Sequence, residues 1–448
     1  MNSPITAIIV GAGHRALTYA SYAREHPEEL KIVGVADPAE VPRRKAVDLF
    51  GLKPEQCFDS ARELAEHPKL ADAIINGTMD HQHVPTTLPL LAAGYDILLE
   101  KPLAPDADEM WKLVEATRKH RRRVMVCHVL RYAPFYVGIR KKLEEGAVGK
   151  IINIQTTEHV SYHHMAVSFV RGKHGSTKRC HTSMLLSKCC HDLDLIAWMK
   201  GDTVPKTVGS FGSRMQFRPE MAPEGAGNRC LVDCPAEVES NCLYSARKHY
   251  IDHPDRWSFY VWHDLQSIEN PTLEQKVEEL MREDNPYGRC VYHHDNDVVD
   301  HQSVAIDFAD GATATHNMVG GSSKGSRSIH IIGTTGEIRG CLEESKFLVR
   351  KIDPSPGKEY TEEEVDLNLS GDMHGAFGGH GGGDMRLVAD FVHTLRGEPR
   401  SISCTDLEDS IYGHLLCYTA DRAMGERRVV DLPDLSQKAD ETGPSPAD

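Results

Sequence analysis

The sequence lacks the features that mark membrane, exported and nucleic-acid-binding proteins. No apolar run approaches the ~20 residues that span a bilayer, and the first residues, MNSPITAIIV, have no basic segment ahead of an apolar one. Acidic residues outnumber basic ones, 66 against 51, for a net charge of −15, and the dense basic run KHRRR is short. We therefore expect a cytoplasmic protein that binds neither a membrane nor nucleic acid.

The composition is that of a globular protein, with 40% hydrophobic and 26% charged residues. The 448 residues exceed one ordinary hydrophobic core, so two domains are expected. The twelve cysteines, in a reducing compartment, suit free thiols or metal ligands better than disulfides.

A glycine-rich motif follows the first predicted strand. Residues 5–10, ITAIIV, form a β-branched apolar run typical of a buried parallel strand, and GAGHRA follows at once. In this G-x-G-x-x-G/A pattern Gly11 permits the tight turn, Gly13 leaves room for a pyrophosphate, and Ala16 lets the next helix pack closely. We expect His14 and Arg15, inside the same loop, to contact the dinucleotide as well.

A second predicted strand, KIVGVA, ends in Asp37. A carboxylate there can accept hydrogen bonds from both ribose hydroxyls and repel a 2′-phosphate, which favours NAD over NADP. Nearby Arg43, Arg44 and Lys45 work against this preference, because basic groups can hold the phosphate. Further strands over residues 71–77, 95–99 and 124–129 alternate with helices, which predicts a parallel Rossmann domain over residues 1–130.

The segment Glu100-Lys101-Pro102 follows the strand YDILL. Together with GAGHRA it resembles the glucose–fructose oxidoreductase, inositol dehydrogenase and rhizopine-catabolism (Gfo/Idh/MocA) family, in which a strand ends in E-K-P near the nicotinamide. The resemblance implies that Lys101 contacts the reacting hydroxyl. It also implies cofactor contacts from Glu100, Lys101, Thr78 and His83 of TMDHQH, and Arg131 of VLRYAPFY.

The stretch SKCCHDLDLIAW reads as an amphipathic helix. Ser187, Lys188, His191 and Asp194 share one face by their spacing, while Cys189 and Cys190 point about 100° apart and suit core positions. Family members carry D-x-x-x-H-x-x-D here, which implies that His191 is the proton acceptor. Ser187 replaces the first aspartate, and Lys188 and Asp194 are predicted to bind substrate.

Two further segments are predicted to line the substrate site. The first, residues 157–175, is rich in polar and aromatic residues and supplies Tyr162, His163, His164 and Arg171. The second, FGGHGGGD, supplies His380; its Asp384 can instead cap the N-terminus of the last helix.

The second domain, residues 131–435, is predicted to be α+β. The alternation of its strands, with glycine turns between them, is typical of antiparallel pairs. The resemblance implies that these strands form a large open sheet and that the protein is a homo-oligomer. An insertion over about residues 205–300 contains Cys230, Cys234, Cys242 and Cys290, which suit either a structural zinc site or unligated thiols. The tail, residues 436–448, is predicted to be disordered.

Three functions are compatible with these motifs. The first is an NAD-dependent oxidoreductase that transfers hydride from a hydroxyl of a sugar, cyclitol or glycoside. The second is an NAD-dependent glycosidase that oxidises a hydroxyl transiently, eliminates the aglycone, adds water and reduces the ketone again. The third is an NAD-sensing regulator without activity, against which the retention of Lys101 and His191 argues.

Overall fold

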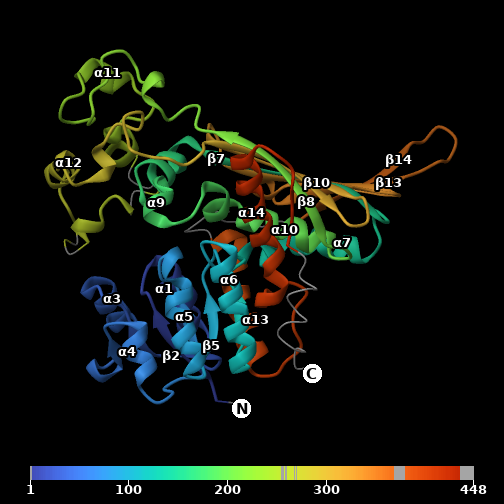
Figure 1. Ribbon diagram of the computed structural model, residues 1–448, viewed down its shortest axis with the longest axis horizontal. Coiled ribbons are helices and arrows are strands. Elements are labelled where there is room, and N and C mark those ends of the chain that lie inside the picture. Colours follow the sequence, from blue (N-terminus) through green and yellow to red (C-terminus); the bar gives the residue numbers. More distant parts are fainter. Residues whose placement is uncertain are drawn as a thin grey trace.

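The computed structural model describes residues 3–253, 257, 260–266, 268, 270–367 and 379–433, arranged as two domains with an insertion at one end (Figure 1). The predicted tail at residues 436–448 lies outside the described residues. None of the helices in the described part of the chain is both long and apolar enough to cross a membrane.

The first domain contains a six-stranded parallel sheet, as its alternating pattern predicts. The strand order is β3-β2-β1-β4-β5-β6, and every neighbouring pair runs parallel. The strands are β1 (Ile5–Val10), β2 (Leu30–Ala36), β3 (Cys57–Phe58), β4 (Ala73–Asn76), β5 (Asp96–Leu99) and β6 (Val124–Val126). Buried apolar side chains on both faces of the strands explain why these segments lack polar alternation.

Helices cover both faces of this sheet. They are α1 (His14–Ala20), α2 (Tyr22–Glu25), α3 (Glu40–Phe50), α4 (Ala61–Glu66), α5 (His83–Ala92) and α6 (Ala107–His120), with short turns η1 (Pro54–Gln56) and η2 (Asp80–Gln82). Two helices near the C-terminus return to the same domain: α13 (Gly379–Leu395) packs on one face, and the start of α14 (Leu407–Glu426) packs on the other. The first domain is therefore completed by residues from the far end of the chain.

The second domain is built on a nine-stranded sheet in the order β14-β13-β12-β11-β7-β10-β9-β8-β15. Only β10 and β7 run parallel, which confirms the predicted mostly antiparallel sheet. The strands are β7 (Ile151–Ser161), β8 (Pro205–Ser213), β9 (His301–Phe308), β10 (Thr313–Ser322), β11 (Ser326–Gly333), β12 (Gly336–Cys341), β13 (Lys346–Ile352), β14 (Tyr360–Asp366) and β15 (Val430–Asp431).

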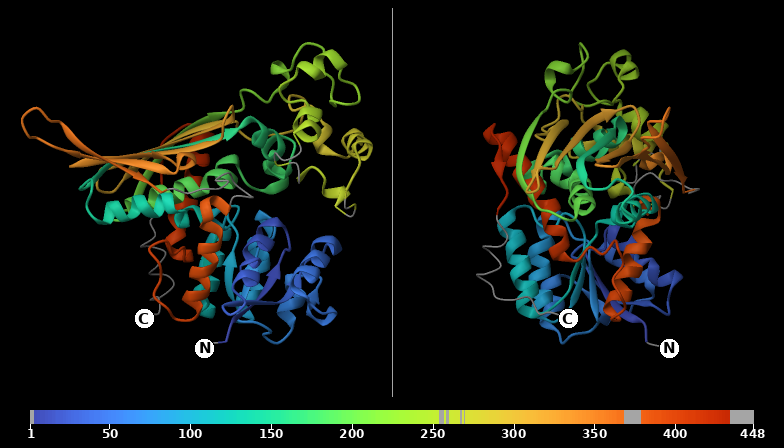
Figure 2. Two further views of the ribbon diagram at one scale, coloured as in Figure 1. Left: turned by 180° about the vertical axis from the view of Figure 1, so that it is seen from behind. Right: turned by 90° about the vertical axis from the view of Figure 1, so that its right-hand side faces the viewer.

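Helices cover one face of the large sheet and join it to the first domain. Helix α10 (Met184–Lys200) lies between the sheet and the first domain and packs against α14 (Figures 1 and 2). The others are η3 (Val129–Tyr132), α7 (Pro134–Glu144), α8 (Tyr162–His164), the π-helix η4 (Met165–Val170), η5 (Lys173–Gly175), α9 (Thr177–Cys180) and η11 (Leu342–Glu344). The stretch predicted as a helix at residues 187–198 is the middle of α10.

The insertion lies between β8 and β9 and forms a separate lobe at the end of the molecule opposite the β13–β14 hairpin (Figure 2). Its elements are short: η6 (Pro219–Met221), α11 (Ala236–Asn241), the π-helix η7 (Lys248–Asp252), η9 (His263–Leu265), α12 (Leu273–Met281) and η10 (Pro286–Gly288). Its apolar cluster has few buried members, namely Val167, Cys230, Ala246, Tyr250, Val261 and Leu280. The lobe therefore has little hydrophobic core of its own.

Candidate active site

The glycine loop leaves open space where the sequence predicts a pyrophosphate. Gly11 has φ +75°, and a Cβ there would lie 2.7 Å from the backbone nitrogen of Thr78. A Cβ on Gly13 would meet only the carbonyl oxygen of Gly77, at 4.0 Å. Since α1 begins directly after Gly13, its free N–H groups open onto this space, and the loop fits a dinucleotide.

Asp37 lies at the C-terminal end of β2 beside the glycine loop. One carboxylate oxygen accepts a hydrogen bond from the N–H of Ala12 at 2.7 Å, and the other accepts from Ala39 at 2.8 Å. Arg43 donates to the carbonyl oxygen of Asp37 and to the carboxylate of Asp59, each at 2.6 Å. The basic residue nearest to Asp37 is thus already held by an acidic one, which favours a free 2′-hydroxyl over a phosphate.

Arg15 belongs to a buried network rather than pointing freely into the loop. Its guanidinium donates to Asp384 at 2.6 and 3.3 Å and to Glu100 at 3.0 Å, and Tyr19 donates to Glu100 at 2.8 Å. Burial opposes the charge of Glu100, yet Arg15 and Lys101 hold its pKa below the usual range. The network fastens α1 to α13 and to the E-K-P segment. Asp384 lies inside α13 instead of capping it, so the interpretation as an N-cap was wrong.

His14 and His83 have different surroundings in the same region. His14 is half-buried in the loop, where burial and the nearby Arg15 lower its pKa to about 4. His83 is fully buried, and its two ring nitrogens lie 2.6 Å from the carbonyl oxygen of Pro102 and 3.1 Å from that of Thr78. His83 therefore joins two loops at the sheet edge, and its contacts are structural rather than with an exposed ligand.

Lys101 reaches from the first domain to helix α10. Its ammonium donates to the backbone carbonyl oxygen of Ser187 at 2.7 Å. The Ser187 hydroxyl turns back along its own helix and donates to Ser183 at 2.8 Å, so it does not replace the missing carboxylate. His191, one helical turn beyond Ser187, is 5% exposed. The structure thus brings the two predicted catalytic residues to the same junction.

His191 lies in a group of buried imidazoles. Its ring centroid is 5.6 Å from that of His128, which lies 5.2 Å from that of His414. Burial, with Arg131 and Lys101 nearby, lowers the pKa of His128 well below its ordinary value. These rings form a neutral, water-poor wall behind His191.

Arg131 and Asp194 bind each other. The guanidinium donates to both carboxylate oxygens, at 2.8 and 2.6 Å, and their side chains are only 3% and 1% exposed. Arg131 also donates to the carbonyl oxygens of Cys404 and Asp409. The structure therefore gives no free polar group for the cofactor contact predicted for Arg131 or the substrate contact predicted for Asp194.

Lys188 lies on a different face of α10 from Ser187 and His191. It forms an ion pair with Glu158 of β7 at 3.1 Å, while Arg327 of β11 contacts Glu158 at 2.6 Å and Asp192 at 3.1 Å. The expectation that one face would hold all four polar residues was wrong, because Lys188 and Asp192 face the large sheet. Cys189 lies there too, with ligand atoms of Asp192 and His316 within 4.8 Å.

The segment predicted to line the substrate site is divided by burial. Tyr162 and His164 are half-buried, and His164 stacks on Trp257 with ring centroids 4.0 Å apart. His163 is buried, and its Nε2 lies 2.9 Å from the carbonyl oxygen of His249. The imidazole of His163 also stacks on the imidazole of His249. Tyr162 and His164 remain candidates for the wall, whereas His163 packs into the insertion. The side chain of His380 lies outside the described residues.

Asp80 and His174 were missed by the sequence reasoning. Asp80 is 6% exposed and lies 3.7 Å from Nδ1 of His174. Burial opposes its charge, but His174, Lys173 and Lys101 are among the groups that hold its pKa below the usual range. Asp80 stands between Thr78 and His83 in the stretch TMDHQH, so its place beside two predicted cofactor residues was the available signal. It supplies a carboxylate near Lys101.

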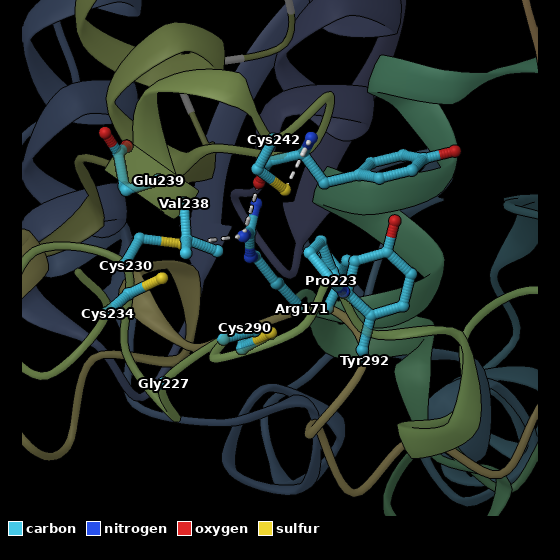
Figure 3. A pocket seen from close by; sticks show the side chains of 13 residues that line it. Arg171, Pro223, Gly227, Cys230, Cys234, Val238, Glu239, Cys242, Cys290 and Tyr292 are labelled. Atoms are coloured by element: carbon cyan, nitrogen blue, oxygen red, sulfur yellow. Dashed lines mark hydrogen bonds between the residues drawn. The ribbon is translucent and has the colours of Figure 1, made fainter. Parts of the chain in front are cut away.

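Arg171 and the four cysteines of the insertion lie together, away from the glycine loop. Cys230, Cys234, Cys242 and Cys290 line one pocket, and Arg171 reaches up among them (Figure 3). Arg171 is 1% exposed, so its predicted role as a substrate residue has no support in its surroundings. None of the described cysteines is in a disulfide.

Two companion models of one family match most of the chain. A family model described as "Oxidoreductase family, NAD-binding Rossmann fold" matches residues 5–128, and its companion, "Oxidoreductase family, C-terminal alpha/beta domain", matches residues 140–432.

Individual relatives agree with these models. "Putative oxidoreductase YteT" of Bacillus subtilis is 24% identical over 414 residues, which is 90% of this chain and 91% of the relative. An "Inositol 2-dehydrogenase" of Corynebacterium glutamicum is 30% identical over 250 residues, which is 53% of this chain and 68% of the relative. The fold is similar to that of a levoglucosan dehydrogenase solved with NADH, with a TM-score of 0.66, 17% identity, and coverage of 96% and 100%.

Proposed function

Because the chain belongs to the Gfo/Idh/MocA oxidoreductase family, we propose that it is an NAD-dependent dehydrogenase acting on a hydroxyl of a sugar or cyclitol. The observation that carries this proposal is the hydrogen bond from Lys101 to the carbonyl oxygen of Ser187, at 2.7 Å. It ties the end of β5, beside the dinucleotide loop, to the helix that holds His191.

The residues at this junction suit removal of a hydroxyl proton. When bound, a nicotinamide dinucleotide supplies the hydride acceptor. Lys101 donates a hydrogen bond to the substrate oxygen and stabilises negative charge there, and His191 accepts the proton. The buried rings of His128 and His414 exclude water from the side behind His191. Asp80 provides the negative charge that Ser187 lacks.

NAD is the proposed cofactor because of the surroundings of Asp37. Its carboxylate stands at the end of β2 beside the glycine loop, and Arg43 is engaged by Asp59. The similarity to a dehydrogenase solved with NADH supports the same assignment. The names of the relatives, inositol 2-dehydrogenase and levoglucosan dehydrogenase, support a cyclitol or a sugar derivative as the substrate class.

The test is a product assay on a panel of cyclitols, free sugars and aryl glycosides, with NAD far below the substrate concentration. A dehydrogenase stops at one equivalent of product per NAD and leaves reduced nicotinamide. Continued release of aglycone with almost no reduced cofactor would identify the redox-assisted glycosidase instead. Binding of NAD without any turnover on this panel would favour the regulator.

Variants of the proposed catalytic residues test their roles. We expect Lys101→Met and His191→Asn each to lower kcat by about 10²–10⁴-fold, the range for a proton-transfer group. Lys112→Met is the matched control, because Lys112 pairs with Glu109 on the exposed face of α6. We expect this substitution to leave kcat unchanged. Full turnover by Lys101→Met would refute the assignment.

We also propose that the enzyme is a homo-oligomer formed through the open face of the large sheet. Large exposed apolar side chains alternate with buried residues on two strands of the sheet, Phe211 of β8 at 77% and Val319 of β10 at 41%. Exposed apolar groups on a sheet face are typical of a protein interface. Light scattering on the purified protein tests this, and a monomer mass at micromolar concentration would contradict it.

A further inference from the structure

The insertion holds four thiols that come from separate parts of its chain. Cys230 and Cys234 lie in the turn before α11, Cys242 ends that helix, and Cys290 follows η10. The N–H of Cys230 donates to Gly288 at 3.0 Å, and the N–H of Cys290 donates to Asn228 at 2.7 Å. These two backbone hydrogen bonds place Cys230 beside Cys290, and all four thiols line one pocket (Figure 3).

A buried cation lies in this pocket without a carboxylate partner. Arg171 donates to Sγ of Cys230 at 3.5 Å, and its other partners are the carbonyl oxygens of Arg289 and Tyr244 and the hydroxyl of Tyr250. Throughout the described ranges, no carboxylate forms an ion pair with Arg171. The carboxylate that lines the pocket, Glu239, accepts a hydrogen bond from the hydroxyl of Ser245 instead. Because a buried charge without a counter-charge is unfavourable, an anionic partner is expected here.

Four thiols that line one pocket can supply that charge together when they bind a divalent ion, and none of the described cysteines is in a disulfide. Four thiols around a divalent ion release four protons, and the resulting tetrathiolate carries a net charge of −2. Such a centre is the missing counter-charge for Arg171.

We propose that Cys230, Cys234, Cys242 and Cys290 bind one zinc ion, and that Arg171 is the positioning residue which balances the charge of that site. Zinc is the ion that a four-cysteine structural site takes. Its Zn–S bonds of about 2.3 Å require sulfurs about 3.8 Å apart. No three of these four described cysteines meet within 4.8 Å, so the thiols move inward as the ion binds.

The zinc site stabilises the wall of the active site as well as the insertion. Arg171 directly follows η4, which begins after Tyr162 and His164, and precedes η5, which holds His174 beside Asp80. Val167 of η4 belongs to the small apolar cluster of the insertion, and the N–H of Thr177 donates to the carboxylate of Asp297 at 2.6 Å. Loss of the ion therefore loosens the segment that faces Lys101.

Metal analysis of the purified full-length protein tests the site. We expect about one zinc per chain by inductively coupled plasma mass spectrometry, and loss of that zinc in Cys234→Ser and Cys290→Ser. Cys57→Ser is the matched control, since Cys57 is half-buried in the first domain, far along the chain from the insertion. Iron with visible absorbance near 400 nm would overturn the assignment to zinc.

A second measurement does not depend on the variants folding. A mercurial titrated into the wild-type protein, with a zinc-sensitive dye present, should release one zinc as the thiols react. Arg171→Lys keeps the positive charge but removes the several hydrogen bonds of the guanidinium. We expect the rate of zinc release to a chelator to rise by about 10-fold in this variant. Metal-free protein with four freely reactive thiols, or with disulfides among these cysteines, would overturn the proposal. None of these readouts depends on the proposed dehydrogenase activity.

Discussion

Replacing Arg131 by methionine tests whether that residue holds the fold together or contacts the cofactor. The change leaves the Asp194 carboxylate, 1% exposed, without its two charge-assisted hydrogen bonds. Removing one partner of a buried ion pair costs about 3–5 kcal/mol, because the other charge remains buried. We expect Arg131→Met to lower the free energy of unfolding by this amount in equilibrium urea denaturation, with little change in the Kd of NAD.

The pH dependence of that loss follows from Asp194. Burial raises the pKa of Asp194 even in the wild type, although Arg131 opposes the shift. Without Arg131 the pKa rises further, so the folded state holds a proton that the unfolded state releases above about pH 3.9. The stability of the variant relative to the wild type should therefore fall as pH rises, and the loss should be smaller at pH 5 than at pH 8.

A double-mutant cycle completes the test. Arg131→Met combined with Asp194→Leu removes both charges, so we expect the pair to recover on the order of 2 kcal/mol relative to the sum of the single changes. Arg62→Met is the control, because Arg62 is 89% exposed and its loss should change stability by about 0.5 kcal/mol or less. A change below about 1 kcal/mol in Arg131→Met, together with a ten-fold higher Kd for NAD, would refute the structural role.

Three further outcomes are expected. Asp37→Ser removes the carboxylate at the end of β2 that repels a 2′-phosphate, so it should raise the NADP-to-NAD ratio of kcat/KM by at least about ten-fold, or 1.4 kcal/mol. An unchanged ratio in steady-state assays would contradict the ribose contact. His414 is fully buried, and burial lowers its pKa to about 3. Below pH 6.5 the unfolded state therefore binds a proton that the folded state does not, and this group lowers the free energy of unfolding by about 2 kcal/mol at pH 5. His414→Gln should reduce the slope of the unfolding free energy against pH, measured in urea, by about one proton. Asp300 accepts hydrogen bonds from the N–H groups of Met215 and Gln216, where the insertion begins. Asp300→Ala should lower the local stability of the insertion by about 2 kcal/mol and speed its limited proteolysis. Unchanged cleavage would show that these hydrogen bonds do not stabilise the insertion.

The first domain and its loop could be predicted because their signals are local. GAGHRA requires a turn with positive φ at Gly11 and a close approach at Gly13, and both depend on a few adjacent residues. The same holds for the helix that carries His191, whose apolar spacing predicts α10. Family resemblance supplied the expectation that Lys101 and His191 act together, and the structure places both at one junction.

The roles of charged residues could not be predicted in the same way, because their partners are distant in sequence. Asp194 is paired by Arg131, 63 positions away, and Arg15 by Asp384, 369 positions away. Arg171 stood in a polar, aromatic stretch that suggested a substrate wall, but the folded insertion surrounds it with cysteines. A charge is stabilised or exposed according to what the whole chain brings next to it.

The sequence by itself determined the parallel first domain, the dinucleotide loop and the mostly antiparallel second sheet, since periodicity and short motifs depend on near neighbours. Tertiary structure alone decided which polar residues remain available. It turned Ser187 away from Lys101, gave Lys188 to Glu158 and brought Asp80 close to the lysine. The reason is physical: burial and ion pairing are properties of residues in contact, and those contacts form only when the chain has folded.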